Sequence, residues 1–462
     1  MNANYMRNIL IIGAGRSACY LIQYLLEKAE SEDLYITIGD LSEESAQRFT
    51  QGHDRAQGIQ LDIFDAPQRS AAVAAADLVI SMLPARFHLE VAKDCIQYEK
   101  HLVTASYVSD EMQALDTEAK ARGLVFMNEI GVDPGIDHMS AMQVIDRIRD
   151  AGGKMLMFES FTGGLVAPES DDNLWNYKFT WNPRNVVLAG QGGAAEFIQE
   201  GTTKYIPYHR LFRRTEFLDI EGYGRFEALA NRNSLKYRSI YGLEDVLTLY
   251  RGTMRRVGFS KAWNMFVQLG LTDDTYEIQN SEALSYRDFI NLYLPYSPTD
   301  SVELKVRYAL KIDQDDIMWD KLLELDIFNK EKKIGIKNAT PAQALQKILM
   351  DKWTLQQEDK DMIVMYHKFG YELDGQQHQI DSKMVMIGKD QTFTAMAATV
   401  GLPVGMAALK ILNKEITTPG VQRPLSREVY TPILRELEEH GIHFKEEEVE
   451  YLGYNVAGGA SA

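Results

Sequence analysis

Cysteine is scarce in this sequence, with only Cys19 and Cys95 among 462 residues. Two thiols are too few for a disulfide framework or a thiolate metal cluster, so we expect a reducing compartment. Redox chemistry in such a chain requires a borrowed cofactor. The sequence also lacks a run of eighteen or more apolar residues and an N-terminal secretory signal, so we expect a cytoplasmic protein without a membrane span.

Basic residues are outnumbered, with 49 lysines and arginines against 66 aspartates and glutamates and a net charge of −17. This balance disfavours nucleic acids and anionic membrane surfaces as partners, while small anionic ligands can still bind at local arginines. The length exceeds that of one ordinary core, and 45% of the residues are hydrophobic. Two or more globular domains are therefore expected.

The first 135 residues alternate between short apolar runs and helix-like segments. The runs are β-branched and apolar, as buried parallel strands are. They cover residues 8–12, 35–39, 78–83, 101–105 and 124–127. This alternation predicts an α/β fold with a Rossmann-type, doubly wound parallel sheet.

A glycine-rich turn, GAGRSA, follows the first predicted strand and has the pattern G-x-G-x-x-A. Gly13 allows a tight turn, Gly15 lets a pyrophosphate approach the backbone, and Ala18 lets the helix pack close to the strand. Arg16 and Ser17 lie between them, where helix N–H groups point at phosphates. The turn predicts a dinucleotide site, and a glycine-rich turn without a ligand is the alternative.

The second predicted strand ends in Gly39-Asp40. A carboxylate there can accept hydrogen bonds from the adenosine ribose hydroxyls and repels a 2′-phosphate, so NAD is favoured and NADP stays possible. The alternative is that Asp40 caps the following helix, a task that Ser42 can also perform.

In a doubly wound sheet, ligands bind outside the carboxyl ends of the strands. The candidates at those ends are Leu83, Ser106, Tyr107, Val132 and Asp133. Asp133 precedes a Pro-Gly turn and is the candidate for chemistry. Asp137 is expected to be the N-cap of the next helix. A metal site at Asp133, Asp137 and His138 is a further alternative, but no second ligand cluster is evident and no metal is predicted.

Several longer strings carry a resemblance to a known family. They are GAGRSA, LPARFH, VTASYVSDEM, MNEIGVDPGIDH, FESFTGGLVAPESDDN, NYKFTW, NRNSL, YRGTMRRVGF and TAMAATVGLPVGMAALKIL. Together and in this order they resemble saccharopine reductase, the saccharopine dehydrogenase that forms L-glutamate. Carboxynorspermidine and carboxyspermidine dehydrogenases are wider relatives.

The resemblance implies a Rossmann domain over residues 1–130 and an α+β substrate-binding and dimerisation domain over residues 131–390, built on a mixed sheet. Residues 391–462 would return to the Rossmann domain, and the protein would be a homodimer. Within the middle domain we expect a strand at residues 154–163, helices from 243 to about 359 and a hairpin from 364–373 and 383–390. Residues 395–412 are expected to form one helix that is rich in small residues and interrupted by Gly401 and Pro403.

The resemblance also implies a reaction: α-aminoadipate semialdehyde and glutamate join through an imine, which a nicotinamide hydride reduces to saccharopine. Tyr107 and Asp133 match the family's catalytic and substrate-contacting positions. The substrate-binding candidates are completed by Thr162, Arg232, Thr253 and Arg255, with Lys178 and Arg184 of lower rank. The cofactor-binding candidates are Gly13, Gly15, Arg16, Ser17, Ala18, Asp40, Leu83, Ser106 and Val132.

Two departures from fungal members of the family affect this expectation. Those members have cysteine where this chain has Thr162, so no thiol can assist proton transfer here. They also carry a basic residue after the second strand and prefer NADP, whereas this chain has Asp40. A carboxylated-polyamine dehydrogenase is the alternative activity, and it would require more acids and fewer arginines in the pocket. A nucleotide-binding sensor without catalysis is the third hypothesis.

Overall fold

The computed structural model describes residues 6–50 and 52–453 and contains two compact units. The first unit spans Met1–Gly153 and Met384–Lys445, and the second spans Lys154–Lys383 and Glu446–Ala462. The boundaries between the units differ from the expected domain boundaries. The first lies after Gly153 and not after residue 130, and the second lies after Lys383 and not after residue 390. The first boundary lies after residue 150 because helix α7 (Ile136–Asp150) packs against α17 (Arg427–Glu439) within the first unit.

The first unit is built on a seven-stranded sheet in the order β15-β6-β5-β4-β1-β2-β3, in which every neighbouring pair is parallel. The strands are β1 (Arg7–Ile12), β2 (Leu34–Asp40), β3 (Ala56–Gln60), β4 (Leu78–Ser81), β5 (His101–Val103), β6 (Val125–Met127) and β15 (Gly420–Gln422). The predicted Rossmann-type sheet is confirmed. The strand order reverses between β1 and β4, which is where such sheets open a ligand crevice.

Two strands of this sheet were not predicted. Strand β3 lies at the edge of the sheet, and none of its residues is fully buried, so its sequence AQGIQ has no apolar run. Strand β15 is only three residues long and comes from the C-terminal part of the chain, where it pairs with β6. Neither strand carries the hydrophobic pattern on which sequence-based strand prediction depends.

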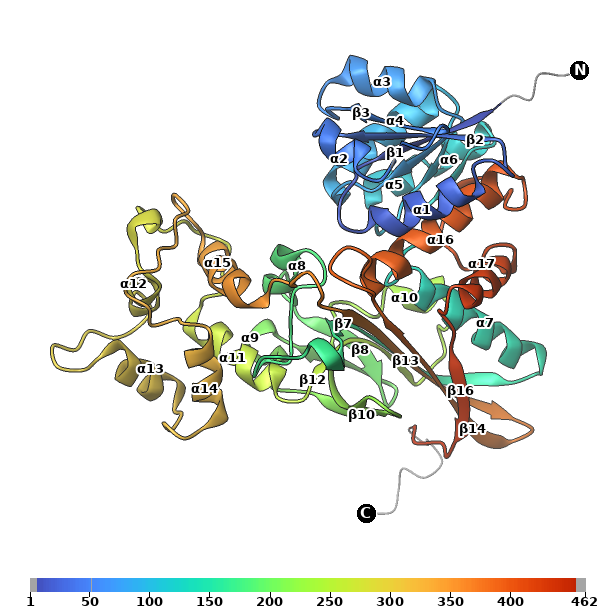
Figure 1. The fold of residues 1–462 in the computed structure, drawn as a ribbon. Helices are drawn as coiled ribbons and strands as arrows, with labels where there is room; N and C mark the ends of the chain where they lie inside the picture. The colour runs from blue at the N-terminus through green and yellow to red at the C-terminus, as the bar shows by residue number, and fades with distance from the viewer. Residues whose placement is uncertain (1–5, 51, 454–462) are drawn as a thin grey trace, which may run out of the picture. The chain divides into compact units, whose positions relative to one another are not determined.

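Two helices of the first unit pack unusually closely. The helices of this unit are α1 (Ala18–Lys28), α2 (Glu43–Gln47), α3 (Ala66–Ala74), α4 (His88–Gln97), α5 (Asp110–Ala114), α6 (Asp116–Ala121), α7, α16 (Ala395–Leu412) and α17. Figure 1 shows α1 beside α16, and a Cβ atom at Gly401 would lie 2.8 Å from the backbone nitrogen of Leu21. The absence of a side chain at Gly401 therefore permits the close approach.

The predicted helix over residues 395–412 is confirmed as α16, but the predicted interruption at Gly401 and Pro403 is wrong, because the helix continues through both residues. It is long and apolar enough to cross a membrane, but 78% of its eighteen-residue window is buried inside the protein. Its apolar character is accounted for by this packing, because a core helix is apolar on all sides.

The second unit contains a mixed sheet in the order β10-β11-β12-β7-β13-β14-β16, with β8 and β9 attached beside β12. The strands are β7 (Lys154–Val166), β8 (Ala195–Gln199), β9 (Thr202–Ile206), β10 (Glu216–Ile220), β11 (Gly224–Ala230), β12 (Thr248–Arg256), β13 (Asp361–Leu373), β14 (Gln376–Ile387) and β16 (Lys445–Val449). Strand β12 pairs parallel with β7 and antiparallel with β11. The predicted mixed sheet is confirmed, and the predicted hairpin is present as β13 and β14, with its second strand beginning at Gln376 and not at residue 383.

The prediction of helices from residue 243 onward was wrong for β12. Its sequence TLYRGTMRR has too many polar residues for an apolar run, yet most of its side chains are buried between β11 and β7. The helices follow it as α11 (Phe259–Leu269), α12 (Tyr286–Asn291), α13 (Val302–Leu310), α14 (Ile317–Glu324) and α15 (Pro341–Trp353). Figure 1 shows α12, α13 and α14 gathered together.

Candidate functional site

The glycine-rich turn between β1 and α1 has the geometry that a dinucleotide requires. Gly13 has φ +103°, and a Cβ atom there would lie 3.1 Å from the carbonyl oxygen of Met82, so the turn is pressed against the chain that follows β4. Gly15 is exposed, and no atom lies within 4 Å of its Cβ position. The first turn of α1 has no acidic residue to repel a phosphate. These residues fit a pyrophosphate.

Asp40 lies at the carboxyl end of β2 and contacts this turn. Its Oδ2 accepts a hydrogen bond from the backbone nitrogen of Ala14 at 2.8 Å, and its Oδ1 accepts one from Ser42 at 3.2 Å. The N-cap of α2 is Ser42, whose side chain accepts from Ser45. The capping role considered for Asp40 is therefore wrong, and its carboxylate stands beside the glycine-rich turn.

Three apolar side chains form a rim at the same edge, and no motif in the sequence indicates them. Leu41 after β2 is 61% exposed and Phe64 after β3 is 70% exposed. The Phe64 ring meets the Phe87 ring edge to face at 5.1 Å, and the Arg86 guanidinium lies 4.6 Å from the Phe87 centroid. We call Leu41, Phe64 and Phe87 the apolar rim. Exposed apolar groups concentrated at one edge typically mark a binding surface.

His88 connects the carboxyl ends of β4 and β5. Its Nδ1 lies 2.8 Å from the Ser81 hydroxyl, and its Nε2 lies 2.7 Å from the Ser106 hydroxyl and 3.4 Å from the Thr104 hydroxyl. Burial lowers the pKa of His88 to about 4. The imidazole is therefore neutral near pH 7, and it holds the side chain of Ser106, a predicted cofactor contact.

Tyr107 and Asp133, the two residues predicted for catalysis, lie together. The Tyr107 hydroxyl donates to Asp133 Oδ1 at 3.2 Å, with Tyr107 44% exposed and Asp133 half-buried. A tight turn presents Asp133, because the Gly131 nitrogen donates to the Pro134 carbonyl at 2.9 Å. Gly135 closes the turn with φ +146°, and a Cβ atom there would lie 2.1 Å from the Gly131 oxygen. Only glycine fits this position.

The remaining cofactor candidates in the first unit surround the same edge. Arg16 is exposed, Ser17 is the N-cap residue of α1 without a side-chain cap bond, Ala18 is buried and Leu83 is half-buried. Val132 is 8% exposed, and its carbonyl accepts from the Asp137 nitrogen at 3.1 Å.

Asp137 is not the N-cap of α7, contrary to the prediction. The helix begins at Ile136 after the N-cap residue Gly135, and the Asp137 carboxylate accepts from the Gly135 nitrogen at 2.6 Å. His138 Nε2 lies 2.9 Å from Glu129 Oε2. Among residues 6–50 and 52–453, no group of three or more His, Cys, Asp or Glu side chains is arranged to hold a metal ion.

In the second unit, three predicted substrate residues share one face of the mixed sheet. Thr253 on β12 is directly opposite Thr162 on β7 in the strand register. Arg255 is two residues further along β12, so its side chain leaves the sheet on the same side. The Thr162 hydroxyl is buried and has no hydrogen-bond partner within the described part of the chain. A buried hydroxyl without a partner is suited to a ligand.

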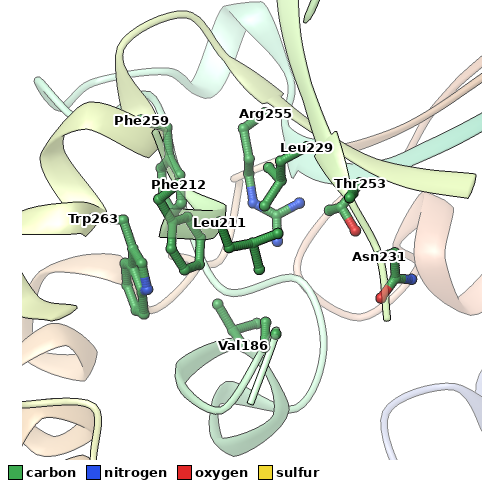
Figure 2. A pocket seen from close by; sticks show the side chains of 12 residues that line it. Val186, Leu211, Phe212, Leu229, Asn231, Thr253, Arg255, Phe259 and Trp263 are labelled. Atoms are coloured by element: carbon green, nitrogen blue, oxygen red, sulfur yellow. The ribbon is translucent and has the colours of Figure 1, made fainter. Parts of the chain in front are cut away.

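A pocket opens on this face (Figure 2). Its walls combine polar and aromatic side chains. Figure 2 shows Thr253 and Asn231 on one side, Phe259 and Trp263 on the other, and the Arg255 guanidinium between them. The cavity measures about 30 Å³, which is room for one or two water molecules. Asn231 was not identified from the sequence, whereas its neighbour Arg232 was predicted but is exposed and outside the pocket lining.

Arg255 is buried without an anion. It is 6% exposed, donates to its neighbour's carbonyl at 2.8 Å, and lies 5.2 Å from the Tyr177 ring and 5.4 Å from the Phe259 ring. Across residues 6–50 and 52–453, no carboxylate pairs with it. Burying an unpaired charge is unfavourable, so the pocket suits an anionic ligand. Lys178 and Arg184 differ, because each pairs with a carboxylate of its own unit.

Comparison with known proteins identifies the family. One profile, described as the saccharopine dehydrogenase NADP binding domain, matches residues 9–127, and a second, the saccharopine dehydrogenase C-terminal domain, matches residues 131–442. The chain belongs to the saccharopine dehydrogenase family. Its first unit thus carries the nicotinamide-dinucleotide-binding domain of the saccharopine dehydrogenases.

Relatives match this saccharopine dehydrogenase family member along nearly its whole length. It is 33% identical to saccharopine dehydrogenase (NADP+, L-glutamate-forming) of Saccharomyces cerevisiae, over 96% of this chain and 99% of the relative. It is also 33% identical to mitochondrial alpha-aminoadipic semialdehyde synthase of Rattus norvegicus, of which it spans 47%. The solved structure of apo saccharopine dehydrogenase (L-Glu forming) from Saccharomyces cerevisiae matches with TM-score 0.87 and 31% identity, covering 96% of this chain and 100% of that one.

Proposed function

We propose that the chain is a saccharopine dehydrogenase. The reaction converts saccharopine and water into L-glutamate and α-aminoadipate semialdehyde, with a nicotinamide dinucleotide as hydride acceptor, and its place is in lysine metabolism. The observation that carries this proposal is the 33% identity to the fungal L-glutamate-forming enzyme over 96% of this chain and 99% of that relative. The pairing of Tyr107 with Asp133 at the cofactor edge supplies the proton-transferring groups that the reaction needs.

The first unit supplies the groups that would hold the cofactor. The glycine-rich turn at Gly13 and Gly15 would bind the pyrophosphate, and Asp40 would bind the adenosine ribose. The apolar rim would receive the adenine ring, and Ser106, held by His88, would lie beside the nicotinamide. When bound, the nicotinamide supplies the two-electron hydride chemistry that protein side chains lack.

NAD is the preferred cofactor in this proposal, although the fungal relatives are named for NADP+. The support is Asp40, whose carboxylate is fixed beside the glycine-rich turn by its bonds from Ala14 and Ser42. A carboxylate held there favours two free ribose hydroxyls and opposes a 2′-phosphate through like-charge repulsion.

Asp133 and Tyr107 would handle the protons. In the oxidative direction, the secondary amine of saccharopine loses a proton, its carbon loses a hydride, and a C=N bond forms. Water then adds to this carbon, the C–N bond breaks, and the nitrogen leaves as the amine of glutamate. Asp133 is placed to accept the proton of the amine, which the Tyr107 hydroxyl would pass to the exposed side of the site. Asp133 would then carry the two protons of the attacking water, one at a time, to the nitrogen that leaves as the amine of glutamate.

The pocket of the second unit would bind a substrate carboxylate. Arg255 offers a planar fork that no carboxylate of the described residues pairs with, and the Thr253 and Asn231 side chains line the same space. The alternative substrate, a carboxylated polyamine, is cationic along its chain and would require acids here. None of the residues that line the pocket is acidic.

The family resemblance supports a proposal for the quaternary structure of the protein, and the composition supports one for its location. We propose a homodimer, for which light scattering would give twice the chain mass of 52.4 kDa. A cytoplasmic location is proposed with it.

The proposed activity is tested with purified protein, saccharopine, and NAD or NADP in parallel, by following the absorbance of the reduced nicotinamide. Turnover of saccharopine with release of glutamate is the expected result. Oxidation of carboxynorspermidine or carboxyspermidine without oxidation of saccharopine would overturn the substrate assignment. Binding of a dinucleotide without oxidation of any of the three substrates would favour the sensor hypothesis instead.

A further inference from the structure

Glu129 is a buried carboxylate directly after β6, and the proposed reaction does not use it. It is 3% exposed, and its backbone has φ +55°, a left-handed conformation that is uncommon for a residue with a side chain. Its backbone nitrogen donates to the Ser106 carbonyl at 3.0 Å. Conformations of this kind persist where the surrounding contacts enforce them, and they concentrate at functional sites.

The Glu129 carboxylate joins three separate segments of the first unit. Oε1 accepts from the backbone nitrogen of Val108 at 3.0 Å and from Nε of Arg423 at 2.9 Å. Oε2 lies 2.9 Å from Nε2 of His138. The partners belong to the loop after β5, the segment after β15 and helix α7, respectively. One side chain therefore fixes three segments that are distant in sequence.

Its charge is maintained despite the burial. Burial by itself raises the pKa of Glu129, but the hydrogen bond with His138 and the charges of His138 and Arg423 outweigh it, so the pKa is lower than usual. An anionic carboxylate forms shorter and stronger hydrogen bonds than a neutral acid. The three contacts are therefore charge-assisted.

We propose that Glu129 is a positioning residue that sets the geometry between Tyr107 and Asp133. The inference rests on the proposed function of these two residues. Glu129 holds the chain on both sides of Tyr107, through the Ser106 carbonyl and the Val108 nitrogen. Through His138 it also holds the helix that begins three residues after Asp133. It is thus the common anchor of the loop that carries Tyr107 and the turn that carries Asp133.

The alternative is that Glu129 only stabilises the fold. Both roles lower the stability of a Glu129→Gln variant, so stability alone does not separate them. A matched control is the buried pair of Arg69 and Asp94 in the same unit, with Nε and Oδ2 2.7 Å apart and both residues less than 10% exposed. Asp94→Asn breaks an ion pair of similar burial, whose hydrogen bonds within the described residues join it to Ile63 and Ser70 and not to the loops after β5 and β6.

The test is a double-mutant cycle on kcat for saccharopine oxidation. Glu129→Gln should lower kcat about 100-fold, the loss typical of misplacing a reacting group by about 1 Å, while KM changes less than about threefold. In a Tyr107→Phe background, the same substitution should lower kcat less than about threefold. Asp94→Asn should leave kcat within about twofold of wild type at a similar loss of thermal midpoint. Equal losses in both backgrounds would overturn the proposal.

Two further measurements keep the proposal testable if Glu129→Gln folds poorly or if saccharopine proves not to be the substrate. Arg423→Gln removes one donor and leaves the other two, so a smaller loss of kcat with the same dependence on Tyr107 is expected. A crystal structure of either variant should show the distance from Tyr107 Oη to Asp133 Oδ1 beyond hydrogen-bond range, above about 3.5 Å. An unchanged distance in both variants would overturn the role of Glu129 whatever the substrate is. Absence of saccharopine turnover by the wild type would instead count against the proposed function.

Discussion

The Tyr107 hydroxyl donates a hydrogen bond to Asp133 Oδ1 at 3.2 Å, although the two residues lie 26 positions apart in the chain. They belong to the loops that follow the neighbouring strands β5 and β6, so the parallel sheet brings them together at its carboxyl edge. Tyr107 is exposed and Asp133 is half-buried. The pair therefore connects solvent with a sheltered carboxylate, an arrangement suited to moving protons.

Replacing either member of this pair should impair turnover more than binding. For Asp133→Asn we expect kcat for saccharopine oxidation to fall by about 10² to 10⁴, the range typical of a lost general acid–base group. Tyr107→Phe should lower kcat less, because Asp133 stays in place. Steady-state formation of reduced nicotinamide measures both. The control is Tyr205→Phe, an exposed tyrosine of the second unit. A folded Asp133→Asn protein with normal kcat would remove Asp133 from the chemistry.

Asp40 should determine the choice between NAD and NADP. Asp40→Asn keeps the size of the side chain and removes its charge, so charge-assisted hydrogen bonds to the ribose become neutral ones. We expect this change to cost about 1.4 kcal/mol of binding free energy, which corresponds to a tenfold weaker affinity for NAD. NADP should bind to Asp40→Asn more tightly than to the wild type, because the carboxylate no longer repels its 2′-phosphate. Calorimetric titration of both cofactors measures this. A wild-type protein that prefers NADP would contradict the role given to Asp40.

The apolar rim should recognise the adenine half of the cofactor. Phe64→Ala removes a 70% exposed ring that meets the Phe87 ring at 5.1 Å. We expect Kd for the dinucleotide to rise about tenfold, the effect of losing roughly 1.4 kcal/mol of ring contact. Nicotinamide mononucleotide has no adenine, so its affinity should not change. Phe217→Ala, at a 59% exposed phenylalanine of the second unit, is the matched control. Equal weakening for both ligands would refute the assignment.

Much of the cofactor edge was predictable because its signals are local in sequence. The glycine-rich turn, its small residue Ala18 and the acid at the end of the second strand fall within one strand-helix-strand unit, whose pattern has a direct physical meaning. The edge strand β3 has no such signal, since its half-exposed residues provide no apolar run. The strand β12 was mistaken for part of a helical region because its arginines and glycine conceal its burial.

The contacts that support the site depend on the fold and were not predictable. Glu129 and Arg423 are 294 positions apart, and no local pattern indicates that they meet. His88 lies within the string LPARFH, but nothing in that string indicates its role. Its position between the Ser81 and Ser106 hydroxyls depends on how β4 and β5 are aligned in the sheet. Asp137 illustrates the converse. A local N-cap preference was applied to it, but the Gly131 to Gly135 turn starts the helix at Ile136, two residues earlier than an N-cap at Asp137 would.

Arg255 should set the affinity for a carboxylate substrate. Arg255→Gln removes a buried guanidinium that has no anion within the described residues, so KM for saccharopine should rise about 10- to 100-fold with the loss of 1.5–3 kcal/mol of charge-assisted hydrogen bonding. Arg255→Lys keeps the charge but not the planar fork, so its KM for saccharopine should lie between the values of the wild type and Arg255→Gln. The affinity for NAD, measured by titration, should be unchanged. An unchanged KM would show that the carboxylate binds elsewhere.

His88 should make the stability of the protein depend on pH in a defined window. Burial lowers the pKa of His88 from 6.5 to about 4, and its partners are the hydroxyls of Ser81, Thr104 and Ser106. Between pH 6.5 and 4 the unfolded chain therefore binds more protons at this position than the folded chain, so stability falls as the pH falls. The contribution of His88 to the free energy of unfolding is fully present above pH 6.5. The size of its pKa shift limits this contribution to about 3 kcal/mol.

Comparing wild type with His88→Asn isolates this contribution, because other titrating groups are common to both proteins. The stability advantage of the wild type, measured by urea unfolding, should be constant from pH 8 to 7 and should shrink steadily towards pH 4. His209→Gln, at an exposed histidine of the second unit, is the control and should follow the wild type at every pH. An advantage that stays constant down to pH 4 would mean that His88 titrates alike in the folded and unfolded chains. Its imidazole would then carry charge in the folded protein near pH 6, and it would no longer be the neutral link between Ser81 and Ser106.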